Sequence, residues 1–123
     1  MLAGLMAGHP LPTGRRVEPD PTLVEPVPAH HAEARVDDDG RTLTVVFSRG
    51  VWQRLHAVEV RRTPGRVEVA VRLGITPELA AEMERRPTFF TMQAIVEHTV
   101  VTLDEPLGDR ELVVAAGPAA RSE

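Results

Sequence analysis

Hydrophobic and polar residues alternate most regularly between Arg54 and Leu73, RLHAVEVRRTPGRVEVAVRL. A period of two is typical of a half-buried β-strand, and Pro64-Gly65 divides the stretch into two such runs. We therefore expect an antiparallel hairpin whose valines share one face. The predicted cross-strand pairs are Val60 with Val69, Val58 with Val71, Arg61 with Glu68 and, at the end furthest from the turn, His56 with Leu73.

A second hairpin is predicted upstream. Residues 32–36 can form a short strand, and the acidic run Asp37–Gly40 ends in Asp-Gly, a strong turn signal. The stretch 41–48, RTLTVVFS, then alternates with Leu43, Val45 and Phe47 on one face, which indicates a half-buried strand.

Two further β segments follow. Residues 88–103, TFFTMQAIVEHTVVTL, form a long segment whose alternation changes phase between Val96 and Val100. This change predicts a bulge or bend near Glu97-His98. The turn-rich stretch 104–110 then leads to a last short strand at 111–115.

One segment, ITPELAAEMERRP, has helical features. Thr76 is placed to cap the helix N-terminus, and Pro87 ends the helix, which we expect over about 77–86. Leu79 and Met83 lie four residues apart and form a narrow apolar face. So short a helix is expected to pack on the sheet for stability.

These elements predict a mainly β fold, an antiparallel β-sandwich or strongly curved sheet of five to seven strands crossed by one short helix. An open barrel is the alternative. We expect a single β domain at 32–116. Residues 1–31 are expected to be an apolar leader and a proline-rich flexible arm, which Leu23 and Val24 could pin to the domain. Residues 117–123 are expected to be a flexible tail.

Composition narrows the function classes. The net charge is −4 and no basic stripe is present, so nucleic-acid binding is not expected. No cysteine is available for disulfides or thiol chemistry. The apolar stretch Met1–Gly8 is too short to span a bilayer and lacks signal-peptide features. As written, the chain is expected in the cytoplasm, or exported or envelope-anchored if the true start lies upstream of Met1.

Catalytic and metal-binding patterns are scarce. No glycine-rich loop precedes the helix, and only Ser48 and Ser122 could serve as serine nucleophiles. His30-His31 with Glu33 and Asp37–Asp39 contains metal-ligand residue types, but adjacent side chains on a strand point to opposite faces. We therefore predict no metal, no cofactor and no catalytic residue.

The sequence leaves more than one role possible for two histidines and three aromatic residues. His56 and His98, with nearby carboxylates, could act in a small enzyme, although a general base also needs an orienting partner and a pocket. Trp52, Phe89 and Phe90 could be core residues or binding anchors. If the molecule has a site, the end of the 54–73 hairpin beside Trp52 and His56 is where we expect it.

The run from residue 36 to 114, and above all LDEPLGDR at Leu103–Arg110, resembles a group of uncharacterised small actinobacterial β-domain proteins. Many of these are exported or lipoprotein-like. Members often carry cysteines near the positions of Trp52 and Phe90, and this chain has neither. This departure is consistent with a reducing compartment, or with an aromatic contact between Trp52 and Phe90 in place of the disulfide. The resemblance supplies no catalytic residues.

Three functions are consistent with the sequence. The favoured one is a non-catalytic binding or accessory β-domain of the cell envelope, whose partner is a protein or a small ligand. The alternatives are a structural or assembly subunit that pairs through edge strands, and a small enzyme that uses His56 and His98.

Overall fold

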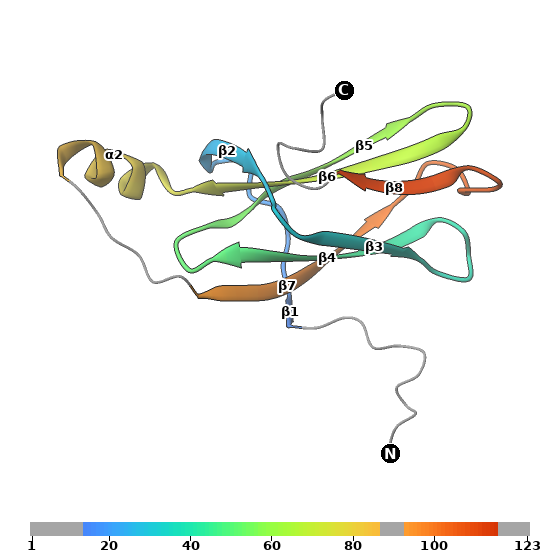
Figure 1. Cartoon of the computed structure of the whole chain (residues 1–123), viewed down its shortest axis with the longest axis horizontal. Helices are drawn as coiled ribbons and strands as arrows, with labels where there is room; N and C mark the ends of the chain where they lie inside the picture. Colours follow the sequence, from blue (N-terminus) through green and yellow to red (C-terminus); the bar gives the residue numbers. More distant parts are fainter. Residues whose placement is uncertain (1–13, 87–92, 116–123) are drawn as a thin grey trace, which may run out of the picture.

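The computed structural model describes residues 14–86 and 93–115. These residues form eight strands and one helix, and Figure 1 shows the strands as two layers. The elements are β1 (Arg15–Arg16), β2 (Val24–Pro28), β3 (Ala32–Val36), β4 (Thr42–Gly50), β5 (Arg54–Arg62), β6 (Arg66–Ile75), α2 (Pro77–Arg85), β7 (Ala94–Thr102) and β8 (Glu111–Ala115). The mainly β fold with one short helix is confirmed, and the described strands do not close into a barrel.

The first sheet has the strand order β1-β7-β4-β3. β3 and β4 form the predicted hairpin around the acidic turn, where Gly40 adopts a φ of +73° that favours glycine. β4 then pairs with β7 over its whole length. The inward apolar side chains of β4 are at most 2% exposed, as the alternation predicts: Leu43, Val45 and Phe47.

β6 is the central strand of the second sheet. β5 lies along one edge of β6, while β2 and β8 share the other edge. The predicted hairpin register is confirmed, because Val60 pairs with Val69 and Val58 with Val71. Arg61 also faces Glu68, and their side chains form an ion pair of 3.2 Å. β1 and β8 each pair in parallel, so both sheets are mixed rather than purely antiparallel.

The predicted pairing of His56 with Leu73 is wrong. The register shifts by one residue between Leu55 and Ala57, and Leu55 occupies the position opposite Leu73. Leu55 is 2% exposed, whereas His56 lies half-buried on the other face, where its Cβ approaches Gly74. A β-bulge therefore buries the leucine in place of the histidine, which lowers the cost of desolvation.

The bulge predicted near Glu97-His98 is not present. β7 pairs with β4 from Thr102 to Ala94 with no break in register. Glu97 and Thr99 are buried on the inner face, 3% and 1% exposed, and His98 between them points outward. The alternation changes phase in the sequence because two polar side chains occupy inner positions.

The helix prediction is confirmed in its position and its cap. α2 begins after Thr76, whose side chain accepts a hydrogen bond from the Leu79 N–H, 3.1 Å away. Its packing differs from the expectation. No residue of α2 is buried, Met83 is 37% exposed, and the helix projects beyond the end of the sheets instead of crossing them (Figure 1).

Residues 14–31 of the expected arm belong to the sandwich. β1 pairs with β7 and β2 pairs with β6. Leu23 and Ala29 are 5% and 2% exposed, and Leu23 packs so closely over Gly74 that a Cβ there would lie 2.9 Å from the Leu23 Cβ. The domain therefore starts upstream of residue 32. Three predictions lie outside the described residues: the apolar leader with the first part of the arm (1–13), the tail at 117–123 and the start of the 88–103 segment, with Phe89 and Phe90.

Candidate functional site

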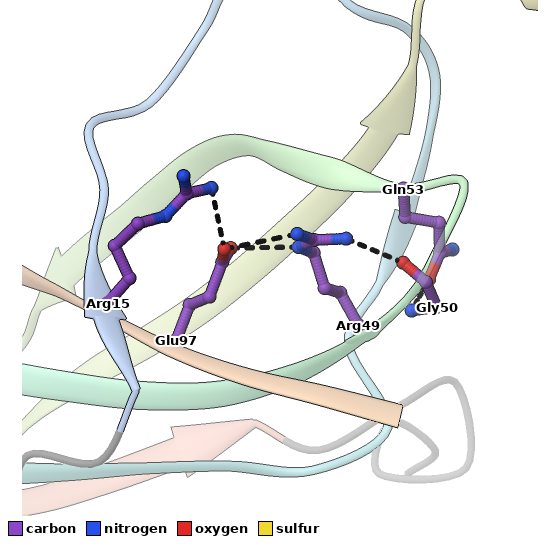
Figure 2. A network of polar contacts seen from close by, with 5 residues as sticks. All are labelled: Arg15, Arg49, Gly50, Gln53 and Glu97. Carbon is purple, nitrogen blue, oxygen red and sulfur yellow. Dashed lines mark hydrogen bonds and ion pairs between the residues drawn. The ribbon is translucent and has the colours of Figure 1, made fainter. Parts of the chain in front are cut away.

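An ion-pair network joins Arg15 of β1, Arg49 of β4 and Glu97 of β7, and its central pair, Arg49 and Glu97, is largely buried (Figure 2). The Arg49 Nε donates to the Glu97 Oε1 at 2.8 Å, and its Nη2 donates to Oε2 at 3.1 Å. The Arg15 Nη2 also donates to Oε2, at 3.1 Å. Because the side chains of Arg49 and Glu97 are 10% and 4% exposed, both charges are largely removed from water.

Strand alternation places these side chains. Arg49 is the next inward position of β4 after Phe47, and Glu97 is the inward residue of β7 before Thr99. Arg15 reaches the network from β1. Gly14, just before β1, approaches β7 so closely that an added Cβ would lie 1.8 Å from the Val96 carbonyl oxygen. The three charges come from three strands of one sheet.

The network holds Glu97 in its ionised form. The hydrogen bond from Arg49 lowers the pKa of Glu97 below its ordinary value of 4.5, burial opposes this, and Arg15 lowers the pKa further. A carboxylate whose two oxygens accept three charged N–H groups is a poor general base. The network therefore acts as a structural clamp between β1, β4 and β7.

A pocket of about 680 Å³ opens beside this clamp, and we call it the Trp52 pocket. It lies where the β2–β3 link, the β4–β5 turn and the start of β7 meet. Its apolar lining residues are Val27, Pro28, Trp52, Leu73 and Ala94. Its polar lining residues are His30, His31, Ser48, Arg49, Gln53 and Gln93.

The wall of the Trp52 pocket formed by the β4–β5 turn is held in place by local contacts. The indole packs against Gly50, where an added Cβ would lie 2.7 Å from the Trp52 Cζ3 and Cη2. The Gln53 Oε1 accepts a hydrogen bond of 2.8 Å from the Gly50 N–H, and the Arg49 Nη1 donates to the Gly50 carbonyl oxygen at 3.0 Å (Figure 2). These contacts join the pocket wall to the buried clamp, so the wall is pre-organised.

The two candidate catalytic histidines do not share a site. His56 lies on the outer face of the second sheet, with its Nδ1 3.4 Å from the Asp20 carbonyl oxygen. His98 lies on the outer face of the first sheet, and its buried Nδ1 has no hydrogen-bond partner among residues 14–86 and 93–115. The sandwich core therefore separates the two imidazoles.

The nearby carboxylates also have structural partners. Hydrogen bonds from the Thr22 side chain and backbone lower the pKa of Asp20, so this carboxylate stabilises its own turn. The Asp104 Oδ2 lies 3.3 Å from the Arg62 Nη1. Neither carboxylate orients an imidazole, which is what a general base requires.

The acidic turn lies at the other end of β3 from His30 and His31. Hydrogen bonds from Thr42 and from the Arg41 and Thr42 backbone lower the pKa of Asp39 to about 2. Within the described ranges, no three histidine and acidic side chains are grouped so that they could hold a metal ion. No helix of those ranges has the length and apolarity to cross a membrane.

The sequence predicts a possible site at the end of the 54–73 hairpin beside Trp52, and the Trp52 pocket lies at that end. This prediction missed Arg49 and Glu97, although continuing the alternation of Leu43, Val45 and Phe47 by one step would have placed Arg49 inside. An inward arginine requires an inward acid, and Glu97 is the acid on the neighbouring strand. Comparison with known protein families, curated proteins and solved structures found no match to this chain.

Proposed function

We propose that this protein is a non-catalytic binding domain that holds a small ligand in the Trp52 pocket. The observation that carries the proposal is the pocket itself, whose volume of about 680 Å³ lies within the range of small-molecule sites. A wall of apolar side chains with a few amides, imidazoles and a hydroxyl is also typical of such sites. The ligand class that fits is a molecule with an apolar body and hydrogen-bonding groups at its edge.

The polar groups around the pocket support binding rather than catalysis. The Arg49 guanidinium is already engaged by Glu97 and by the Gly50 carbonyl, so it is not available to polarise a substrate. Hydrogen bonds lower the pKa values of the Glu97, Asp20 and Asp39 carboxyl groups, so all three stay ionised near neutral pH. A general acid would need the opposite shift.

An accessory role at the cell envelope is the second part of the proposal. It rests on the resemblance of residues 36–114 to small exported or lipoprotein-like domains. A ligand-binding domain at the envelope would present the pocket to molecules outside the cytoplasm. Locating the full-length protein in fractionated source cells, with and without protease treatment of intact cells, tests this part separately from ligand binding.

Trp52 provides the test of ligand binding, because it is the only tryptophan in the chain. A library of small apolar and amphipathic compounds is screened by ligand-observed NMR, and the compounds that bind are titrated against Trp52 fluorescence. We expect the compounds that bind to shift the emission. Ala94→Phe should fill the pocket and abolish binding, whereas Ala115→Phe, at an exposed position of β8 that does not line the pocket, should retain it.

The proposal fails if no compound binds, or if the compounds bind Ala94→Phe and the parent chain equally. A thermal unfolding curve for each variant separates lost binding from lost folding. Equal midpoints for Ala94→Phe and Ala115→Phe make the comparison valid.

A further inference from the structure

Within the part of the chain that the structure describes, β5 is an edge strand of the second sheet. Among the described strands, β5 pairs only with β6. The first part of its outer edge is covered, because the Asp20 N–H donates a hydrogen bond of 3.0 Å to the Leu55 carbonyl. The second part, Val58–Arg62, has no neighbouring strand in the described chain. An open edge of this kind can accept another strand.

Backbone alternation shows which groups face the open edge. The Thr63 N–H donates to the Arg66 carbonyl at 2.9 Å, so Thr63 turns its backbone groups toward β6. In an antiparallel ladder every second residue does so. The N–H and C=O of Val58, Val60 and Arg62 therefore point away from β6, toward the position of an incoming strand.

The two side chains next to Val60 on this strand carry opposite charges. Val60 is 37% exposed, and it is flanked by one acidic and one basic residue. The side chains of Glu59 and Arg61 are 59% and 77% exposed and lie on the outer face of the sheet. An antiparallel copy of the same strand, centred on the same valine, would place each charge opposite its complement.

We propose that two copies of this chain pair through β5, antiparallel, about a two-fold axis that passes beside Val60. In this register Val60 opposes Val60 of the second copy, and Glu59 opposes Arg61 in both halves. In the same register Val58 opposes Arg62, and the paired stretch is Val58–Arg62. This is the part of the edge that the Asp20–Leu55 hydrogen bond leaves free.

The charges within each copy extend the same pattern. Arg61 already pairs with Glu68 of β6, and Glu59 already pairs with Arg72, each at 3.2 Å. In the dimer Arg61 would lie between Glu68 of its own sheet and Glu59 of the second copy. Opposite charges therefore alternate across the joined sheets, and no like charges face one another at the axis.

The dimer is expected to be weak. Five paired residues bury less than the roughly 1,000 Å² that stable interfaces need. We therefore expect a dissociation constant of about 10 µM to 1 mM. The proposal is independent of the Trp52 pocket, so its failure would leave the proposed ligand binding untouched.

Disulfide trapping tests the register, because the chain contains no cysteine. Two Val60→Cys side chains would face each other across the axis with Cα atoms about 5.5 Å apart, within the range of disulfides. Two Val58→Cys side chains would be about 13 Å apart, since each opposes Arg62. Under mild oxidation we expect Val60→Cys to form a covalent dimer rapidly and Val58→Cys to stay monomeric. Equal cross-linking of both variants would overturn the proposed register.

A second variant pair tests the backbone contacts by sedimentation velocity over a concentration series. Val60→Pro removes the outward N–H without removing a β5–β6 hydrogen bond, and an edge strand tolerates such a proline. Val60→Thr keeps the N–H and the β propensity. We expect Val60→Pro to raise the dimer dissociation constant by about tenfold or more, and Val60→Thr to change it little. A parent chain that is monomeric up to about 1 mM, or a dimer that persists in Val60→Pro, would exclude pairing through β5.

Discussion

Glu97 is the buried acid of β7 that pairs with the arginines of β1 and β4. Its carboxylate is 4% exposed and accepts hydrogen bonds from Arg49 and Arg15. Replacing it by glutamine would leave the Arg49 guanidinium buried without a counter-charge. We therefore expect Glu97→Gln to lower the free energy of unfolding by about 3–5 kcal/mol, measured by urea denaturation.

A matched control exists on the other sheet. Glu68 also pairs with arginines, but its partners Arg61 and Arg66 have side chains that are 77% and 49% exposed. Glu68→Gln should therefore lower the free energy of unfolding by about 1 kcal/mol or less. Similar losses for both variants would show that burial of the Arg49–Glu97 pair does not set its contribution.

Acid should weaken the fold through the same carboxylate. Above pH 4.5 Glu97 is ionised in both the folded and the unfolded chain, so the stabilising effect of its lowered pKa is fully present. As the pH falls below 4.5, the unfolded chain binds the proton first, and the free energy of unfolding decreases. Glu97→Gln should reduce the slope of stability against pH in this window. Asp39→Asn should reduce it at lower pH, between 3.8 and about 2. An unchanged slope in Glu97→Gln would contradict the assignment.

At the scale of elements, the alternation of β5 and β6 predicts the hairpin and its register near the turn. It does not predict the bulge. The register with His56 on the inner face and the register with Leu55 there differ by one residue, and the alternation alone does not choose between them. The choice is made by burial, since Leu55 contacts the core that β6 and β4 supply. Alternation also does not predict that Glu97 faces inward. A buried charge is stable only beside an opposite charge, and it is the pairing of β4 with β7 that brings Arg49 to Glu97.

The bulge can be tested with two alanine variants. Leu55→Ala removes a side chain that is 2% exposed and should cost about 2–5 kcal/mol of unfolding free energy. His56→Ala removes a half-buried side chain on the outer face and should cost about 1 kcal/mol or less. A regular hairpin without the bulge predicts the reverse order. Thermal and urea unfolding of both variants decide between the two registers.

β1 is held to β7 by a close approach at Gly14. This residue has a φ of +75°, and an added Cβ would lie 1.8 Å from the Val96 carbonyl oxygen. Gly14→Ala should therefore release β1, and hydrogen exchange of the Val17 amide, which donates to the His98 carbonyl, should become about tenfold faster or more. Gly65→Ala is the matched control, because no atom lies within 4 Å of the added Cβ. Equal exchange in both variants would contradict this role of Gly14.

For the whole molecule, the sequence predicts the sandwich but not where its domain begins. The prolines between residues 19 and 28 made this stretch resemble a tether, and two-residue strands such as β1 leave no periodic signal. Their pairing is long-range, since β1 joins β7 and β2 joins the end of β6. Only the folded sheets provide the edges that these short segments occupy. The Trp52 pocket is equally invisible to local patterns, because residues of β2, β4, β6, β7 and the β4–β5 turn build it together.

This placement predicts that residues 32–123 alone are not a stable domain. That fragment lacks β1 and β2, the Arg15 contact to Glu97, and the buried side chains of Leu23 and Ala29. It should unfold at a markedly lower urea concentration than the full chain, because apolar surface of β6 and the edge of β7 become exposed. A peptide of residues 14–31 should bind the fragment and raise its unfolding midpoint by mass action, whereas the same peptide with Leu23→Asp should not. A fragment as stable as the full chain would show instead that the first two strands only lie on the surface, as a tether would.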